Sequence, residues 1–411
     1  MEVKEASSTS ADGKMDEDTG KVHLKRQLGL ISAVSMIAGT MIGSGIFMSP
    51  QWVLYHMGSP GSSLLIWAAC GLLAMLGALS YAELGTVITE SGGDYIYILR
   101  NVGSLPAFLL AYTSVIVVRP AGIAGISLSF AEYVVAAFYP GCPSPQAVIK
   151  CTAAVCIIVL GTINCLNVRL SMSIMNFFTA AKLIVLLVII VGGLVLLVKG
   201  NTQVFHNAFA NTATGFGPVG VAFYQGLWSY DGWNNLNYIT EELKNPEVNL
   251  PRAVMLAIPL VTCVYLLANV SYFAAMTPQE LLTSDAVAIS WGLKVLGTWT
   301  WIISLGVALS TIGSANGTFF SGGRVCYVAA REGHLVPIII PVIVLIAAVY
   351  LVLAPIIGSP QLEYLYVTLF ILSGLILYIP VVRYKWSPGW FHSVTLHLQL
   401  LLQVAPTDKN N

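Results

Sequence analysis

From residue 29 to residue 382 the chain alternates between long apolar runs and short polar segments. A helix that crosses a bilayer needs roughly 20 mostly apolar residues, whereas a membrane strand alternates in polarity over about 10 residues. The runs here are continuous, so they predict membrane helices rather than barrel strands. Ten spans are expected, at residues 29–50, 62–85, 105–138, 148–166, 173–198, 217–241, 253–276, 298–330, 336–357 and 362–382.

Two of these runs contain small and polar residues that weaken a membrane helix. The first holds Gly-Thr-Met-Ile-Gly-Ser-Gly-Ile-Phe over residues 39–47, and each glycine destabilises a helix by roughly 1 kcal/mol relative to alanine. The sixth holds Gly-Leu-Trp-Ser-Tyr-Asp-Gly-Trp-Asn-Asn over residues 226–235. We expect both helices to be unwound there, because unwinding presents free backbone groups to a ligand. For the first stretch, close helix packing at Gly39 and Gly43 is the alternative.

The irregular spans come in pairs that lie five spans apart along the chain. Spans one and six are the interrupted ones, and spans three and eight, at 105–138 and 298–330, are the unusually long ones. At about 1.5 Å per residue, both long spans exceed the ~30 Å hydrocarbon core and should be tilted. A shared offset of five predicts an inverted five-plus-five repeat, which is typical of transporters with a substrate site between the broken helices.

Composition agrees with a polytopic membrane protein. Only 9% of the 411 residues are charged, against about 25% in soluble domains, and 56% are hydrophobic. So few charges exclude a soluble enzyme or a nucleic-acid binder with a basic surface. The chain has no His-Glu-x-x-His motif and no acid–histidine pair at catalytic spacing, so we expect neither an enzyme nor a cofactor.

The basic residues predict the orientation of the chain. If both termini lie inside, fourteen of the 19 Lys and Arg residues fall in inner segments and three, Lys150, Lys199 and Lys294, in outer ones. This imbalance favours cytoplasmic termini. The expected organisation is an N-terminal tail at 1–28, a first repeat at 29–198, a partial second repeat at 199–335, two last spans at 336–385 and a C-terminal tail at 386–411.

Several ordered motifs resemble one transporter family. They are Gly39–Phe47, Tyr-Ala-Glu-Leu-Gly at 81–85, Ser-Gly-Gly-Asp-Tyr at 91–95, the stretch from Tyr230 to Leu243, Asn-Pro at 245–246 with Asn-Leu-Pro-Arg at 249–252, Ser310–Thr318, and Arg-Glu-Gly-His at 331–334. Together they resemble the amino acid–polyamine–organocation superfamily, and within it the light subunits of heteromeric amino acid transporters. The resemblance is strongest to the cystine and dibasic, or b-zero-plus, type. It implies an all-α, LeuT-like fold with discontinuous first and sixth helices.

One feature departs from the family pattern. Members of the family have twelve spans, and ten are expected here. The stretch directly after Leu335 resembles the family's last two spans, so the ninth and tenth spans are expected to be missing between Leu335 and Val336. Removing two spans leaves both termini on the same side of the membrane. The charge distribution therefore does not reveal that the spans are missing. The resemblance therefore leaves open whether this chain transports.

The resemblance also implies where a substrate binds. Thr40, Gly43, Ser44 and Gly45 are expected to hold the substrate carboxylate through backbone N–H groups and a hydroxyl. Carbonyl groups of Ile37 and of Trp228, Ser229 and Tyr230 are expected to hold the α-amino group. In the family an aromatic residue at Trp228 closes the site from outside. Packing at the membrane interface or in the core is the alternative for this tryptophan.

Two charged side chains within spans carry further expectations. A charge at mid-membrane costs at least ~2.5 kcal/mol on insertion scales, so Asp231 is expected to serve as a counter-charge for cationic side chains of substrates. The alternative is a structural ion pair with Arg119 or Lys182. The resemblance implies that the Lys182 ammonium replaces the sodium ion of sodium-coupled relatives, and the alternative is that Lys182 reaches toward the inner interface. Glu241 and Glu242 form either an inner gate with basic residues or a solvated helix end.

Cys142 stands apart from the other six cysteines because it lies in a predicted outer loop. The outside is oxidising and no second outer-loop cysteine is available, which favours an intermolecular disulfide over a free thiol or a bond to Cys151. In the family this position joins a single-span glycoprotein heavy subunit.

The resemblance thus predicts a sodium-independent exchanger in the plasma membrane, at the apical surface of epithelia. It would import cystine and cationic amino acids (arginine, lysine and ornithine) in exchange for intracellular neutral ones. The alternatives are a shortened subunit that does not transport and a neutral or mixed L-type exchanger of the same family.

Overall fold

The computed structural model describes residues 26, 28–139, 145–166, 168–284 and 286–334. These residues are almost entirely helical. Their elements are α1 (Leu30–Met41), α2 (Gly45–Met57), α3 (Pro60–Val87), α4 (Asp94–Asn101), α5 (Ser104–Thr113), the π-helix η1 (Ser114–Val118), α6 (Arg119–Phe138), α7 (Gln146–Leu166), α8 (Val168–Val198), α9 (Gln203–His206), α10 (Phe216–Ser229), the 3-10 helix η2 (Asn235–Glu242), α11 (Pro246–Ala275), α12 (Pro278–Leu282), α13 (Val287–Val295), the 3-10 helix η3 (Gly297–Thr300) and α14 (Trp301–Arg331).

The first eight predicted spans each correspond to a helix or to a run of consecutive helices. Six helices of the described residues are long and apolar enough to cross a membrane, or seven spans if α1 and α2 count as one. The first span runs seven residues further than predicted because α2 ends only at Gly58, whose positive φ of 72° closes the helix. Pro60 then starts α3. The two last predicted spans, 336–357 and 362–382, lie outside the described residues, as do both tails.

Both predicted interruptions are present. Residues 42–44 separate α1 from α2, and the two helices are bent by 46°. In the sixth span α10 stops at Ser229, the chain turns at Gly232 with a φ of +103°, and it continues as the 3-10 helix η2. The third span is also irregular, because η1 interrupts the α-helical pattern between α5 and α6. The sequence did not indicate this third irregularity.

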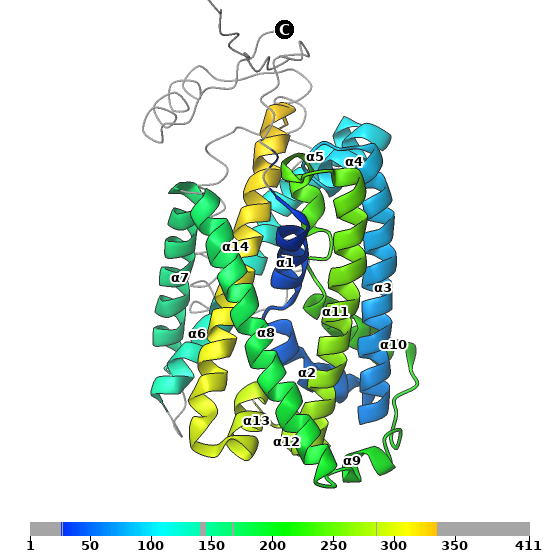
Figure 1. Ribbon diagram of the computed structural model, residues 1–411, viewed down its shortest axis with the longest axis vertical. Coiled ribbons are helices and arrows are strands. Elements are labelled where there is room, and N and C mark those ends of the chain that lie inside the picture. Colours follow the sequence, from blue (N-terminus) through cyan, green and yellow to red (C-terminus); the bar gives the residue numbers. More distant parts are fainter. Residues whose placement is uncertain (1–25, 27, 140–144, 167, 285, 335–411) are drawn as a thin grey trace, which may run out of the picture.

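The packing of the helices follows the predicted repeat. The most extensive contacts join helices five spans apart: α3 packs on α11, and α6 packs on α14. The interrupted spans also meet, since α2 packs on α10. In Figure 1, α1 and α2 lie in the middle of the bundle and α8 crosses in front of them. This arrangement is a LeuT-like fold, as the sequence predicted.

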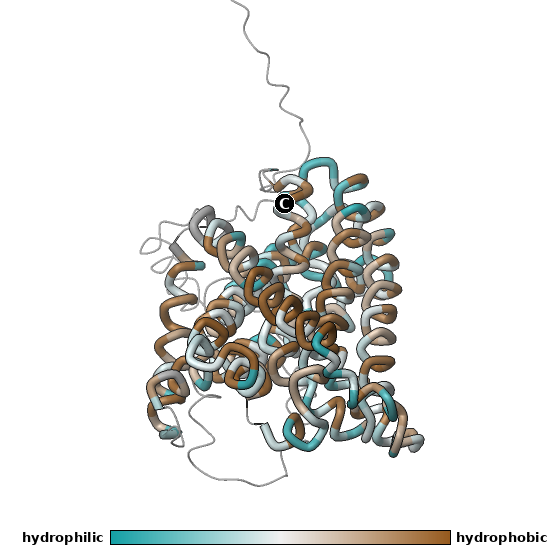
Figure 2. Tube along the Cα trace, turned by 60° about the horizontal axis from the view of Figure 1, so that its bottom comes forward, coloured by the Kyte–Doolittle hydropathy of each residue, from teal (hydrophilic) through white to brown (hydrophobic). Residues whose placement is uncertain are grey.

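The two ends of the bundle separate the loops in the way the charge distribution predicts. The elements α9, α12 and α13, which belong to expected outer segments, gather at the bottom of Figure 1, while α4 lies at the top. Between the ends, apolar side chains point outward, among them Leu65, Leu72 and Ile184, each more than half exposed. Figure 2 shows the resulting hydrophobic helices and more polar ends. Such a surface suits lipid rather than water.

Candidate functional site

The interruption of the first span frees carbonyl groups, and a buried lysine occupies two of them. Lys182 on α8 is fully buried, and its Nζ donates hydrogen bonds to the carbonyl oxygens of Gly39 at 2.5 Å and Ile42 at 2.6 Å. A lysine that reached toward the interface would expose its ammonium. That alternative is therefore excluded. The geometry instead places the Lys182 amino group at carbonyl groups where the helix has opened.

Serine side chains of α14 satisfy further carbonyl groups of the opened turn. Ser314 donates to the Thr40 carbonyl at 2.9 Å, and Ser310 donates to the Ile42 carbonyl at 3.3 Å. A Cβ placed on Gly43 would lie 2.7 Å from the Ser314 oxygen. Glycine at this position therefore permits the close approach of α14.

Tyr265 on α11 connects the two interrupted spans. Its hydroxyl lies 2.6 Å from the Met41 carbonyl and 2.9 Å from the Ser229 carbonyl, so one donor serves the ends of both α1 and α10. The ring packs edge-on against Trp67, with centroids 5.6 Å apart, and against Tyr230 at 5.1 Å. The sequence did not single out Tyr265, because a tyrosine in an apolar span carries no positional signal of its own.

We expect Tyr265→Phe to destabilise the protein by about 1–3 kcal/mol, because the ring stays while two buried carbonyl groups lose their donor. Tyr272→Phe is the matched control, since the Tyr272 hydroxyl is buried on the same helix without a hydrogen-bond partner among the described residues. Thermal unfolding of the purified chain in detergent measures both. Equal melting temperatures for the two variants would contradict the bridging role.

The start of α2 offers unpaired donors. The backbone N–H groups of Ser44, Gly45 and Ile46 have no hydrogen-bond partner among the described residues. The positive end of the α2 dipole lies at the same point. Next to Gly45, the Ser229 hydroxyl is buried and also without a partner in the described part of the chain. Free N–H groups beside an unpaired hydroxyl are suited to bind a carboxylate.

Other predicted ligands already have partners within the protein. The Thr40 hydroxyl donates to the Met36 carbonyl at 2.6 Å, and the Gly43 N–H donates to the Met41 carbonyl at 2.9 Å. Ile37 lies within α1, four residues before its end, so the break does not free its carbonyl. The Trp228 carbonyl accepts from the backbone N–H of Tyr230 and of Asp231. The Ser229 carbonyl accepts from the Tyr265 hydroxyl at 2.9 Å.

Asp231 and Trp228 are the exposed members of the second break. Trp228 is the next-to-last residue of α10 and is 46% exposed, and Asp231 is also exposed. Among the described residues, the Asp231 carboxylate makes no hydrogen bond and no ion pair. The alternative of a structural pair with Arg119 or Lys182 is therefore wrong for this conformation. Gly232 carries the chain back toward α1, where a Cβ added to it would lie 2.9 Å from the Thr40 methyl group.

Arg119 on α6 packs against two other spans instead of a carboxylate. Its guanidinium carbon lies 4.9 Å from the centroid of the Tyr238 ring, and its Nη1 donates to the Ser321 hydroxyl at 3.0 Å. The Tyr238 hydroxyl in turn donates to Asp94 at 2.9 Å. A guanidinium over an aromatic face is stabilised by roughly 0.5–2 kcal/mol, depending on solvation.

Two ion pairs join the inner end of η2 to α14. Glu241 pairs with Arg331 at 3.0 Å, with both side chains only 9% exposed, and Glu242 pairs with Arg324 at 2.7 Å. Leu28 adds a backbone connection, because its N–H donates to the Glu242 carbonyl and its carbonyl accepts from Lys244. The sequence left a solvated helix end as the alternative to an inner gate. These buried ion pairs contradict the solvated helix end.

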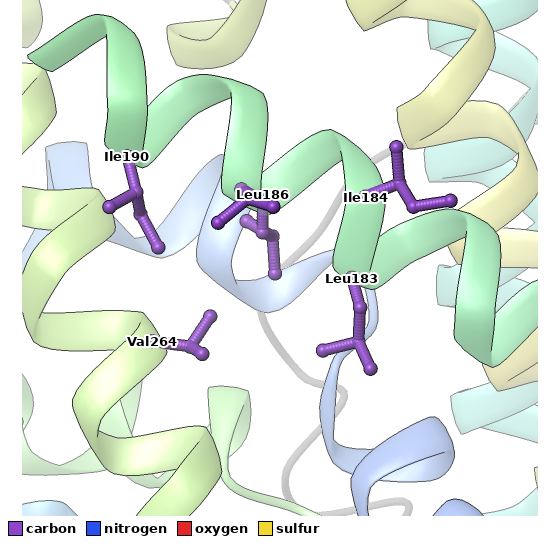
Figure 3. A pocket seen from close by; sticks show the side chains of 6 residues that line it. Leu183, Ile184, Leu186, Ile190 and Val264 are labelled. Carbon is purple, nitrogen blue, oxygen red and sulfur yellow. The ribbon is translucent and has the colours of Figure 1, made fainter.

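Neither of two cavities in the described part of the chain lies at the helix breaks. One, of about 260 Å³, is lined only by apolar side chains of α8 and α11: Leu183, Ile184, Leu186, Leu187, Ile190 and Val264 (Figure 3). The other, of about 20 Å³, has room for roughly one water molecule. It is lined by Asp94, Tyr95, Leu110, Ala111, Ser114, Tyr238 and Val325. The first cavity offers no polar group to an amino acid.

Cys142 lies outside the described residues, so its disulfide stays a prediction. The described residues contain no group of three His, Cys, Asp or Glu side chains that could hold a metal ion.

Comparisons with known proteins identify relatives along most of the chain. The profile of the amino acid permease family matches residues 28–339. The human b(0,+)-type amino acid transporter 1 is 46% identical over 460 aligned positions, which cover 94% of each chain. The mouse large neutral amino acids transporter small subunit 2 is 45% identical over 332 positions, covering 80% of this chain and 62% of the relative. The crystal structure of MhsT with L-phenylalanine superposes with a TM-score of 0.58 at 14% identity, covering 93% of this chain and 98% of MhsT, which supports the fold alone.

The alignment with the human relative also contains many positions that this chain lacks. It has 460 positions, but 94% of 411 residues is only about 386, so about 74 positions of the relative face no residue of this chain. At roughly 20 apolar residues per span, 74 positions suffice for two spans and their loops. The family profile and the mouse alignment are both shorter than this chain, and the profile ends at residue 339, just past Leu335.

Proposed function

The chain belongs to the amino acid permease family, among relatives that are light subunits of heteromeric amino acid transporters, and we propose that it is a sodium-independent exchanger of cystine and cationic amino acids. Arginine, lysine and ornithine enter in exchange for intracellular neutral amino acids. The observation that carries this substrate class is Asp231, an exposed carboxylate with no partner among the described residues, at the break of the sixth span. A free carboxylate at that position attracts an ammonium or guanidinium group.

Substrate binding in this proposal uses both helix breaks. The free N–H groups of Ser44 and Gly45, with the Ser229 hydroxyl, take the substrate carboxylate. Asp231 takes the cationic side chain, and Trp228 closes the site from outside. Thr40 and Gly43 support the site through the backbone rather than by direct contact, because their donors already serve Met36 and Met41. The Lys182 ammonium takes the place of a bound sodium ion, which makes exchange independent of sodium.

Uptake into proteoliposomes tests the proposal. The chain is reconstituted with a heavy subunit, and uptake of labelled arginine and cystine is measured in sodium-free buffer, with and without leucine inside. We expect uptake only with internal leucine, and no change when sodium replaces choline outside. Exchange of leucine for leucine without arginine uptake would instead indicate an L-type exchanger of the same family.

A subunit that assembles without transporting is the second candidate, favoured by the total of about 74 positions of the human relative that face no residue of this chain. In the family, one of the two missing spans belongs to the scaffold against which the mobile bundle moves. This candidate predicts a complex with the heavy subunit but no uptake of any amino acid. Sequencing of the transcript across Leu335 and Val336 shows whether two spans were skipped.

The partner in the proposal is a single-span glycoprotein heavy subunit bound through Cys142 at the plasma membrane. We expect Cys142→Ser to abolish the covalent adduct with the heavy subunit, because the other exposed cysteines lie within predicted spans or at their ends. Non-reducing electrophoresis of cells that express both subunits measures the adduct. Cys151→Ser is the control and should retain it. Persistence of the adduct in the Cys142 variant would exclude this linkage.

A further inference from the structure

Three polar side chains from three spans form a ring of hydrogen bonds. Asn164 of α7 donates through Nδ2 to the Asn316 Oδ1 of α14 at 2.8 Å, and the Ser171 hydroxyl of α8 donates to the Asn164 Oδ1 at 2.8 Å. The Asn316 Nδ2 closes the ring by donating to the Ser171 backbone carbonyl at 3.0 Å. Asn316 is fully buried and Ser171 is 1% exposed. Polar groups buried within spans are costly unless they are paired, and they often serve a function.

Glycines lie on both sides of Asn316 along α14. A Cβ placed on Gly313 would lie 2.7 Å from the Phe178 Cβ and 3.3 Å from the Lys182 Nζ, both on α8. A Cβ placed on Gly317 would lie 3.0 Å from the Thr40 hydroxyl on α1. Small residues let helices approach closely, but a single buried asparagine between helices is what fixes their register. Asn316 is therefore placed to set how α8 lies along α14.

Lys182 lies on the same face of α8 as Ser171. The two residues are 11 positions apart, which is about three turns of 3.6 residues and roughly 16 Å along the helix axis. Thr179 lies between them on this face and approaches α1, where a Cβ on Gly39 would collide with its hydroxyl. The stretch from Ser171 to Lys182 is helical and contains no glycine or proline. A shift of Ser171 along α14 therefore carries Lys182 with it.

We propose that Asn316 is a positioning residue for Lys182. Through Ser171 it fixes the register of α8 on α14, so that the ammonium meets the Gly39 and Ile42 carbonyls. Asn316 itself makes no hydrogen bond to Lys182 within the described part of the chain, so it acts through the helix rather than by contact. The role rests on the proposed function, because it concerns the ammonium that takes the place of sodium there.

A purely structural role for Asn316 makes a different prediction. Residues that support the fold independently of each other have losses that multiply when both are changed, whereas residues that act as one unit do not. If Asn316 acts by positioning Lys182, its loss should matter little once the ammonium has been removed.

A double-mutant cycle on labelled arginine uptake separates the two roles. Proteoliposomes contain the heavy subunit with the unmodified chain, Asn316→Ala, Lys182→Ala or both changes together. We expect Asn316→Ala alone to lower uptake about fivefold or more, and the double variant to fall less than about twofold below Lys182→Ala. Thr318→Val is the matched control, because the Thr318 hydroxyl donates at 3.1 Å to the Ser314 carbonyl of its own helix. It should change uptake by less than about twofold.

Reductive methylation measures the position of the ammonium without requiring transport. Formaldehyde with a borohydride reductant modifies amines that reach solvent, and mass spectrometry gives the modified fraction of each lysine. In the purified complex Lys182 should resist modification, because its Nζ is buried and donates to two carbonyls, whereas the exposed Lys199 should react. We expect Asn316→Ala to raise modification of Lys182 about fivefold or more and to leave Lys199 unchanged. Thr318→Val should change neither.

Each outcome has a defined consequence. Losses that multiply in the double variant, or unchanged modification of Lys182 in Asn316→Ala, overturn the positioning role. If Asn316→Ala does not fold, Ser171→Ala replaces it in both measurements, since it removes one hydroxyl and keeps the carbonyl that Asn316 binds. Normal uptake by Lys182→Ala refutes this inference and leaves amino acid exchange standing. A chain that takes up no amino acid refutes the proposed function, and the methylation result then still decides whether Asn316 positions Lys182.

Discussion

Lys182→Ala is expected to reduce uptake of every substrate more than about tenfold and to lower the thermal stability of the chain. The variant removes the ammonium that donates to the Gly39 and Ile42 carbonyls, at 2.5 and 2.6 Å, inside the fully buried break of the first span. A hydrogen bond from a charged donor contributes about 1.5–3 kcal/mol, and a buried carbonyl left unpaired costs about as much. The opened turn of α1 then loses the group that holds its two carbonyls in place.

The same variant tests the role of Lys182 as a substitute for sodium. Removing the ammonium leaves carbonyl oxygens around a space that a small cation can enter, so residual uptake should rise when sodium replaces choline. Lys199→Ala is the matched control, because Lys199 is an exposed lysine directly after the same helix. It should change neither uptake nor its response to sodium. If Lys182→Ala transports normally and ignores sodium, the ammonium has no such role.

The sequence predicted the fold well because the relevant signals are local. A continuous apolar run indicates a span wherever it occurs, and Gly43, Gly45 and Gly232 mark the breaks because each lies where a side chain would collide or where φ is positive. The five-span offset between irregular spans predicted the repeat. The packing of α3 on α11 and of α6 on α14, each pair five spans apart, confirms it. Helix ends were less accurate, because residues such as Gly58 and Asn245 end or start helices outside the apolar core.

The site could be predicted only in part, because its contacts join spans that are distant in sequence. Tyr265 bridges Met41 and Ser229 over separations of 224 and 36 residues, and no local pattern indicates such a bridge. The predicted role of the Ile37 carbonyl assumed that the break begins earlier in α1 than it does. The environment of Arg119 depends on a ring in η2 and a hydroxyl in α14, both far along the chain. Residue types indicated charge and flexibility, and only the packing shows which groups remain unpaired.

Asp231→Asn should reduce arginine uptake about tenfold or more while leucine uptake changes by less than about twofold. The Asp231 carboxylate is exposed and makes no ion pair or hydrogen bond within the described part of the chain, so its removal leaves no protein group unpaired. What the variant loses is the attraction for a substrate cation, and each tenfold loss corresponds to about 1.4 kcal/mol. Citrulline has nearly the shape of arginine without its charge. The preference for arginine over citrulline should therefore disappear in the variant.

Asp94→Asn is the control that separates charge recognition from general damage. The Asp94 carboxylate accepts hydrogen bonds from Tyr238 at 2.9 Å and from Asn234 at 3.3 Å, so its loss weakens the packing of η2 for all substrates alike. We therefore expect Asp94→Asn to lower arginine and leucine uptake by the same factor, and Asp231→Asn to lower arginine alone. Initial rates of labelled arginine, citrulline and leucine uptake in proteoliposomes measure this difference. Equal loss of arginine and leucine in the Asp231 variant would show that this carboxylate supports the fold rather than selecting the substrate, and the charge preference would then have to come from another group.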